Sequence, residues 1–285
     1  MTYKYVQEIL STATGTEGSL LIVKTIADTL IDEVAKFLIP RSEATMYFGP
    51  GTFGSSIDID LVTADSLKIE QAAEGAAIQL GETQYTSVNI KPDKYGTQIL
   101  ITKEMMEDGK WNLLEQNVKL AGKRLAENET NLIISQALDN AGNTVSGGAA
   151  ITIANITTAM QYLEDNDFGP TTLFIGPEVL NDLRNIDTFV EYSKSGNTDM
   201  MNKGFTGNIY GLTVIKFSAN AAPSTTYSKY AYVIDRSQAY AIAEKRGVTV
   251  ENFDLPTNDL SGATVTQRIR CRHLRANAIA KITTS

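Results

Sequence analysis

The stretch YGTQILITKEMMED, residues 95–108, marks the point where the sequence changes from a strand pattern to a helical one. It ends a strand region that begins near residue 83, and the longest helical signal of the chain starts at residue 103. The helical stripe is formed by Leu114, Val118, Ala121 and Leu125. A helix over 111–140 would be roughly 45 Å long at about 1.5 Å per residue, well beyond the roughly 10–14 residues of an ordinary globular helix. We therefore predict a rod that serves as a scaffold element.

Upstream of this point, two strand regions predict a long ribbon over residues 55–95. Ile57, Ile59 and Leu61 alternate with polar residues, which is typical of a half-buried strand. The second strand region is interrupted at Pro92, because proline cannot take part in a central ladder. A lone two-stranded ribbon is marginal in water, and its unpaired edges favour association. We expect the ribbon to lie against another subunit, which favours a closed symmetric assembly.

The N-terminal region reads as an arm. Residues 1–19 are mostly polar and indicate a loose segment. Apolar residues at helical spacing predict a helix over 23–37, and Pro40 ends it because proline lacks the backbone N–H that a helix needs. The run 49–54 contains three glycines and a proline and predicts a turn.

The C-terminal half predicts an α/β region over 149–246 followed by strands. Asn155 is the expected cap of one helix, and Gly176 with Pro177 is the expected start of another. Strands are predicted at 173–175, 212–215 and 230–234, and a polar loop at 186–208. From residue 248 the pattern is again β.

Charge and composition exclude several classes of protein. Lys and Arg total 25 and Asp and Glu total 33, so the formal net charge is −8 and the pI is about 4.9. A protein that binds nucleic acid by neutralising phosphates carries a basic surplus, so contact with DNA is expected to be local and non-specific. The apolar runs are far shorter than the roughly 18 residues that cross a bilayer, and we expect no membrane association.

The motifs that could carry chemistry have simpler explanations. Gly49, Gly51 and Gly54 match a dinucleotide-binding spacing, but a strand pattern follows where that motif needs a helix. The only cysteine, Cys271, and the only histidine, His273, are too far apart along a strand for a nucleophile–base pair and leave no multi-histidine metal site. The acidic cluster of Asp58, Asp60 and Asp65 lacks the glycine and glutamate of a calcium loop and is expected to be a solvated strand face. We predict no catalytic, cofactor or metal site and expect no enzymatic activity.

A row of basic residues near the C-terminus allows two interpretations. Arg268, Arg270 and Arg272 lie on one face of a predicted strand, with Ile269, Cys271 and His273 on the other, and Arg275 follows. One interpretation is an inward basic patch that faces packaged nucleic acid. The other is salt bridging to acidic strands of the same or a neighbouring subunit, which the acidic surplus elsewhere favours.

Four stretches in this order resemble the major capsid protein of tailed bacterial and archaeal viruses, a fold also used by encapsulins. The first runs from EGAA at 74–77 through residue 108, and the second is the long helix, which looks like the spine helix of the family. The third is FIGPEVLNDLR at 174–184, with Gly176 where Asn is usual. The fourth pairs YGLTV at 210–214 with YVIDRSQAY at 232–240, where Thr213 replaces a proline and Asp235-Arg236 replaces Gly-Asp. The resemblance spans about residues 30–282.

The resemblance implies an α+β fold with an N-terminal arm, an extended β-hairpin loop, a peripheral domain with the spine helix, and an α/β axial domain. The implied boundaries are 1–40 for the arm, 55–95 for the extended loop and 149–246 for the axial domain. The peripheral domain would comprise 41–54, 96–148 and 247–285. Inter-subunit contacts of the extended loop are expected at Lys68, Glu70, Glu74 and Gln79.

The implied function is a structural one. A major capsid protein forms pentamers and hexamers of an icosahedral shell around double-stranded DNA, is assembled in the host cytoplasm and ends in the virion. The implied partners are copies of the chain, a separate scaffolding protein, portal and decoration proteins, and packaged DNA through non-specific contact. The long internal scaffolding segment of many relatives is not seen, which leaves open an encapsulin-type shell around a cargo enzyme as the alternative.

Overall fold

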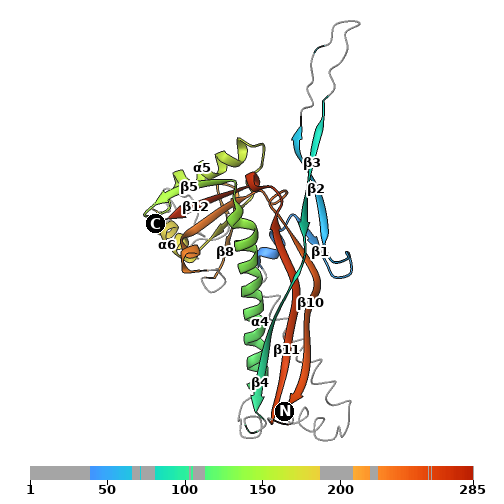
Figure 1. Cartoon of the computed structure of the whole chain (residues 1–285). Helices are drawn as coiled ribbons and strands as arrows, with labels where there is room; N and C mark the ends of the chain where they lie inside the picture. Colours follow the sequence, from blue (N-terminus) through green and yellow to red (C-terminus); the bar gives the residue numbers. More distant parts are fainter. Residues whose placement is uncertain are drawn as a thin grey trace, which may run out of the picture.

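The computed structural model describes residues 39–65, 71, 81–102, 104, 113–186, 208–218, 224–255, 257 and 259–284. Figure 1 shows an elongated molecule in which a long helix and long strands run down from a mixed α/β body, while a hairpin projects the opposite way. Among the described helices, none combines the length and the apolar character that a bilayer crossing requires.

The long strands form a four-stranded sheet in the order β1-β10-β11-β4. Its core is the antiparallel pair β10 (Tyr240–Leu255) and β11 (Leu260–His273), to which β4 (Asp93–Thr102) adds antiparallel and β1 (Met46–Phe48) adds parallel. One face packs on the long helix α4 through Ile99, Leu125 and Val265. The sheet and α4 therefore stiffen each other along their length (Figure 1).

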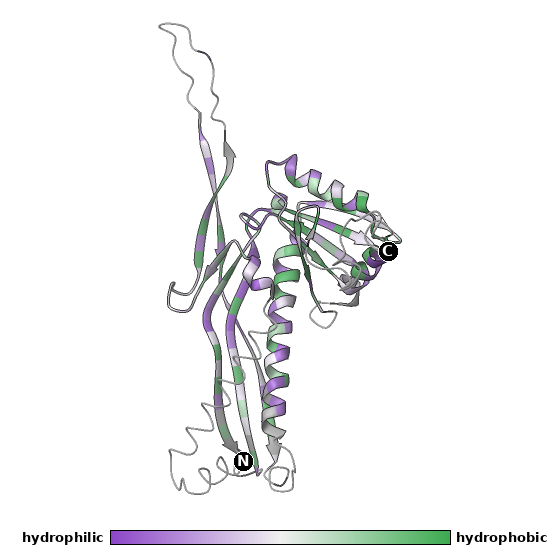
Figure 2. Ribbon diagram, turned by 180° about the vertical axis from the view of Figure 1, so that it is seen from behind, coloured by the Kyte–Doolittle hydropathy of each residue, from purple (hydrophilic) through white to green (hydrophobic). Residues whose placement is uncertain are grey.

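The long helix is confirmed, but its α-helical part ends earlier than predicted. Helix α4 is described over Leu113–Leu132, and it continues as a π-helical turn, η2 (Ile133–Ala137), and a 3-10 turn, η3 (Leu138–Asn140). The hydroxyl of Ser135 donates to the carbonyl of Asn131 at 2.8 Å, a local bond that competes with regular helix bonding. The wider turn buries both Ile133 and Ile134. Figure 2 shows that the end of the long helix that meets the body is mainly hydrophobic.

The body is built on a six-stranded sheet in the order β5-β12-β9-β6-β8-β7. The sheet comprises β5 (Asn143–Gly148), β6 (Thr172–Ile175), β7 (Asn208–Ile209), β8 (Leu212–Lys216), β9 (Tyr230–Ile234) and β12 (Ile279–Thr284). Helices α5 (Ile153–Glu164) and α6 (Pro177–Arg184) share a core with one face. The other face shares a core with the end of the long helix and the upper part of β10 and β11.

The six-stranded sheet contains strands that the predicted boundaries assign to two different domains. Strands β5 and β12 were expected with the long helix, yet they pair with each other in parallel, and β12 also pairs antiparallel with β9. These pairings join residues far apart in the chain, and no local pattern specifies them. The domain boundaries themselves remain a prediction.

Several local predictions are confirmed and one cap is corrected. The strands near 173, 212 and 230 and the start of α6 at Pro177 are as expected. The cap of α5 is Thr152 rather than Asn155, because Asn155 is the partner residue of a capping box: its backbone N–H donates to Thr152 Oγ1 at 3.3 Å, and the Thr152 N–H donates to Asn155 Oδ1 at 2.9 Å. The turn at 49–54 is also confirmed. The helix predicted over 23–37 and the loop over 187–207 lie outside the described residues.

The predicted ribbon is confirmed as a hairpin of β2 (Ile57–Asp65) and β3 (Thr83–Ile90). The two strands form a separate two-stranded sheet. Lys91 and Pro92 separate β3 from β4, so the chain leaves the hairpin and enters the long sheet without a ladder bond at the proline.

Gly176 provides a test of the packing between α6 and the turn η5 (Thr225–Lys229). A Cβ atom at residue 176 would overlap the backbone carbonyl of Ser228, which cannot yield as a flexible side chain does. We expect Gly176→Ala to lower the free energy of unfolding by about 1–3 kcal/mol, measured by urea denaturation of the unassembled chain. Gly169→Ala is the matched control, because nothing lies within 4 Å of a Cβ there. Equal stability of the two variants would contradict this packing.

Candidate assembly surfaces

The base of the hairpin is anchored on the molecule's own body. Ile59 and Ile90 on its inner face are buried against Ala241 and Ala243 of β10 and against Leu274. Side chains of this size each contribute about 1.5–3 kcal/mol when fully buried. The anchored base fixes the direction in which the rest of the hairpin projects.

The outer face of the hairpin is open to solvent. On this face the register places Asp58 opposite Asn89 and Val62 opposite Tyr85, with Asp60 between them on β2. Asp58 and Asp60 are exposed, and Tyr85 keeps 69% of its surface accessible. We call Asp58 and Asp60 the acidic row. Tyrosine is enriched at protein–protein interfaces, so the face that carries Tyr85 is a candidate contact surface.

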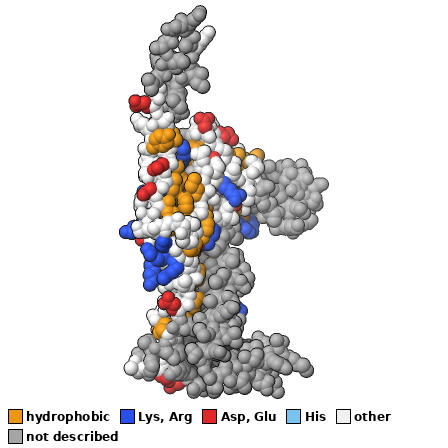
Figure 3. All heavy atoms as spheres, turned by 90° about the vertical axis from the view of Figure 1, so that its right-hand side faces the viewer, with side chains coloured by type: hydrophobic (Ala, Val, Ile, Leu, Met, Phe, Trp, Pro, Cys, Tyr) orange, Lys and Arg blue, Asp and Glu red, His pale blue; other side chains and the backbone are white. Residues whose placement is uncertain are grey.

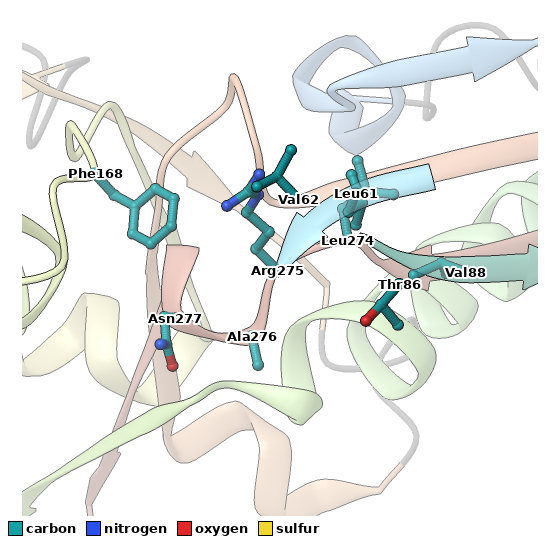
Figure 4. A pocket seen from close by; sticks show the side chains of 9 residues that line it. All are labelled: Leu61, Val62, Thr86, Val88, Phe168, Leu274, Arg275, Ala276 and Asn277. Atoms are coloured by element: carbon teal, nitrogen blue, oxygen red, sulfur yellow. The ribbon is translucent and has the colours of Figure 1, made fainter. Parts of the chain in front are cut away.

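A shallow groove separates the hairpin from the body (Figure 4). It encloses a volume of about 290 Å³ between Leu61 and Val88 of the hairpin, Phe168 of the body and Arg275 after β11. Its walls are mainly apolar, and the side chain of Arg275 makes no hydrogen bond or ion pair with the described residues. The groove has no set of convergent polar groups such as a catalytic pocket requires.

A charged cluster around two buried carboxylates joins five elements of the fold. Arg41 of η1 (Ile39–Glu43) binds Glu129 of α4 with two bonds, Nε to Oε1 at 2.7 Å and Nη2 to Oε2 at 2.6 Å, and donates to Glu244 Oε2 of β10 at 3.2 Å. Gln267 of β11 donates to Glu244 Oε1 at 3.0 Å, and the hydroxyl of Tyr47 in β1 also donates to Glu244. We call these five residues the Arg41 cluster.

The environment of the Arg41 cluster shifts the pKa of its outer members. Burial alone would lower the pKa of Arg41, but the hydrogen bond and charge of Glu129 and the charge of Glu244 raise it above its ordinary value. Burial and then the hydrogen bond to Glu244 raise the pKa of Tyr47 to about 12. Arg41 is therefore a fixed cation and Tyr47 a fixed donor at neutral pH.

Sequence patterns gave little indication of the Arg41 cluster. Arg41 lies 88 residues from Glu129 and 203 residues from Glu244. One signal was available: Glu129 falls four residues after Leu125, in line with the apolar stripe of the helix, where an apolar residue is expected. A charge at that position indicates a buried partner from another segment.

The structure brings three of the four predicted arginines together at the junction of β3 and β4. Arg270 Nη1 lies 2.6 Å from Asp93 Oδ2, Arg268 donates to the carbonyl of Pro92 at 3.3 Å, and Arg272 donates to the carbonyl of Asn89 at 3.1 Å. Arg275 lies apart from them, in the groove. The expected loop contacts Lys68, Glu70, Glu74 and Gln79 lie outside the described residues.

The structure places Cys271 in the core and Asp58 and Asp60 at the surface. Burial raises the pKa of the Cys271 thiol well above its ordinary value, which disfavours the thiolate that a nucleophile or a metal ligand needs. Asp58 and Asp60 are exposed on the hairpin, and the side chain of Asp65 lies outside the described residues. In the part of the chain that the structure describes, no three His, Cys, Asp or Glu side chains gather to hold a metal ion.

The arrangement of a projecting hairpin, a long helix along a long sheet and an α/β body has counterparts among known proteins. A family model described as phage capsid protein matches residues 84–276, more than half of the chain. The chain belongs to the phage capsid protein family. It is a structural capsid protein that associates with copies of itself into the shell of a virion. No curated protein matches the sequence significantly.

Solved structures show the same fold at low identity. The capsid protein resembles a chain from Mycobacterium phage Che8 with a TM-score of 0.68 and 16% identity, covering 87% of this chain and 90% of that one. It also resembles a chain of the capsid of a native GTA particle, with a TM-score of 0.65, 14% identity, and coverage of 87% and 90%. A virus-like particle from Pyrococcus furiosus matches with a TM-score of 0.59 and 15% identity over 92% of this chain and 99% of that one. The α+β capsid fold inferred from the sequence motifs is confirmed.

The Arg41 cluster generates a stability prediction. Arg41→Met removes the only cation from a cluster with two buried carboxylates, so we expect the free energy of unfolding to fall by about 3–5 kcal/mol. Urea denaturation of the unassembled chain measures this. Arg184→Met is the control, because Arg184 is exposed at the end of α6 and a surface charge of this kind should contribute less than about 1 kcal/mol. If the Arg41 variant lost no more stability than the control, the cluster would not constrain the fold as described.

His273 generates a prediction of pH dependence. Burial lowers the pKa of His273 below its ordinary value of 6.5. The unfolded chain therefore binds a proton at this residue more readily than the folded chain, and stability falls as the pH drops below about 6.5. We expect His273→Gln to reduce the loss of unfolding free energy between pH 7.5 and pH 5.5, measured by urea denaturation at both values. An unchanged pH dependence would assign that loss to the carboxylates instead.

Proposed function

We propose that this capsid protein assembles into pentamers and hexamers of an icosahedral shell that encloses double-stranded DNA. The observation that carries the proposal is the β2–β3 hairpin, a two-stranded sheet whose described residues pack on the body at its base. A hairpin of this kind gains little stability by itself, so it needs a partner surface. A second copy of the chain is the partner that a shell supplies at every subunit.

The contacts of the hairpin suit a multivalent assembly. Its outer face offers Val62 and Tyr85 as exposed apolar groups beside the acidic row, and its edges are unpaired in the described part of the chain. We propose that Lys68, Glu70, Glu74 and Gln79 extend this contact onto the neighbouring subunit. Each contact is modest, and a closed shell multiplies modest contacts into a stable container.

The other partners follow from the same role. The body on the six-stranded sheet is proposed to be the axial domain, which meets its copies at the five-fold and six-fold centres. A separate scaffolding protein, a portal and decoration proteins are proposed partners, and assembly is placed in the host cytoplasm before the protein becomes part of the virion. The net charge of −8 supports non-specific contact with DNA that is packaged by other means than attraction to the wall. No catalytic role is proposed.

The encapsulin alternative has less support. The virus-like particle from Pyrococcus furiosus shares the fold, but the family model that matches this chain is that of phage capsid proteins. Phage and encapsulin shells differ in what they enclose, so the genes beside the coding sequence separate them: terminase and portal genes for a phage, a cargo enzyme for an encapsulin.

The hairpin contact can be tested by substitution of its exposed aromatic residue. Tyr85→Asp places a charge where an apolar contact is proposed, and we expect the yield of shells to fall at least about tenfold, since about 1.4 kcal/mol per interface is enough for that change. Shells formed by the purified chain, with scaffold supplied if required, are counted by sedimentation and negative-stain electron microscopy. Tyr162→Asp on α5 is the matched control, since Tyr162 is also exposed.

The outcome that would contradict the proposal is a strictly monomeric chain at high concentration with scaffold supplied. Shell assembly by Tyr85→Asp at the yield of the control would remove the hairpin face from the contact while leaving the capsid role intact. Circular dichroism of the unassembled variants establishes that each one is folded.

A further inference from the structure

The face of the four-stranded sheet that points away from α4 carries five cations in one group. The register places Arg268 of β11 opposite Lys94 of β4 on one side and opposite Arg246 of β10 on the other. Arg270 and Arg272 follow at two-residue spacing, and so lie on the same face. We call these five residues the cationic row. Like charges opposite each other on neighbouring strands repel, so the sheet supports this row at a cost in stability.

Contacts within the chain neutralise the cationic row only in part. Asp93 is the one carboxylate that pairs with it among the described residues, through Arg270. Arg246 donates from Nη2 to Thr266 Oγ1 at 2.8 Å, but its Nε is buried without a hydrogen-bond partner in the described part of the chain. Lys94 is exposed and makes no described side-chain contact. Each guanidinium has five N–H donors, and the bonds named here use only one of them on each of Arg268, Arg270 and Arg272, of which Arg272 is exposed.

The outer face of the hairpin carries carboxylates at the same spacing as the arginines of the cationic row. Asp58 and Asp60 are two residues apart on β2, so their carboxylates stand about 6.5–7 Å apart along the strand. The same repeat separates Arg268 from Arg270 and Arg270 from Arg272. Asn89 donates to Asp58 Oδ1 at 2.5 Å and leaves Oδ2 available, and Asp60 makes no described side-chain contact.

The acidic row and the cationic row lie at different heights on one side of the molecule. Figure 3 shows acidic side chains along the upper part of this side, below the grey tip, and a cluster of Lys and Arg below them. No ion pair joins Asp58 or Asp60 to the cationic row within the described residues. A contact between the two rows of different copies is heterologous, and a heterologous contact closes into a ring when its rotation allows.

We propose that the acidic row Asp58–Asp60 of one copy docks on the cationic row of a second copy. The inference rests on the proposed self-assembly and names the charged surfaces that set its register. Arginine and carboxylate groups form paired, charge-assisted hydrogen bonds, which favour one alignment of the two strands over others. Repetition of the contact around the shell compensates for the small contribution of each exposed pair.

Charge reversal in both directions tests the pairing. The acidic variant is Asp58→Arg with Asp60→Arg, and the basic variant is Arg268→Glu with Arg272→Glu. We expect each variant alone to lose shell yield at least about tenfold by sedimentation and electron microscopy. A chain that carries all four substitutions restores attraction between the rows at every contact and is expected to recover most of that yield.

Matched controls reverse charges elsewhere on the surface. Glu164→Arg with Asp165→Arg changes two exposed acids at the end of α5, and Arg184→Glu with Lys216→Glu changes two exposed bases of the body. Because Arg268 and Arg272 also hold the β3–β4 junction, Lys94→Glu and Asp60→Lys form a second complementary pair that removes no described bond. Circular dichroism establishes that each unassembled chain is folded.

Each outcome decides the inference. Recovery in the combined chain supports it. Wild-type yields from both reversals, or a folded combined chain that does not recover the yield, overturn it, and the proposed shell is unaffected by either result. Normal assembly of the basic variant with loss of retention of a linear double-stranded DNA fragment would assign the cationic row to nucleic acid and also overturn it. Failure of the wild-type chain to form shells under any condition overturns the proposed function and this inference with it.

Discussion

The constraint on which much of this structure depends is the pairing of one partly buried guanidinium with two buried carboxylates. Arg41, Glu129 and Glu244 come from a 3-10 turn, a long helix and a long strand, and a charge left unpaired in that interior would carry a large desolvation penalty. The three segments can therefore meet in one register only. Because Gln267 and Tyr47 fill the remaining acceptor positions of the glutamates, the cluster also fixes β11 and β1. We infer that its main contribution is specificity of packing rather than net stability.

Because α4 packs on the four-stranded sheet in a fixed register, the strand that supports the hairpin is held in place. Ile59 and Ile90 rest on Ala241 and Ala243, which lie only a few residues from Glu244 on the same strand. Any tilt of the helix against the sheet would therefore move the strand on which the hairpin stands. A shell needs subunits that present their contact surfaces at constant angles, since small errors repeated around a ring prevent its closure. In this chain β10 connects the Arg41 cluster in the interior with the hairpin on the exterior.

Local patterns predicted the parts of the fold that depend on neighbours in sequence. Alternation identified β2, Pro92 marked the end of the hairpin, and helical spacing identified α4. The faces of β11 were also predictable, with Ile269 and Cys271 buried and the arginines outward. The π-helical turn after Leu132, the pairing of β5 with β12, and the Arg41 cluster were not predictable in this way, because each depends on contacts between segments far apart in the chain. Thr152 and Asn155 show a subtler limit: both residues are part of one capping box, and the sequence alone does not say which is the cap.

The distribution of charge matters more for this protein than its sum. A net charge of −8 repels a polyanion such as DNA from most of the surface, yet the sheet face concentrates five cations near one carboxylate. A cationic group of this kind is suited to recognise a second copy of the same chain, because each copy brings both signs in fixed positions. The two acids have the same spacing as the arginines, so the rows can make several charge-assisted hydrogen bonds at once when the two strands lie side by side. Each of these exposed pairs is weak, and their repetition around a closed shell is what makes the contact count.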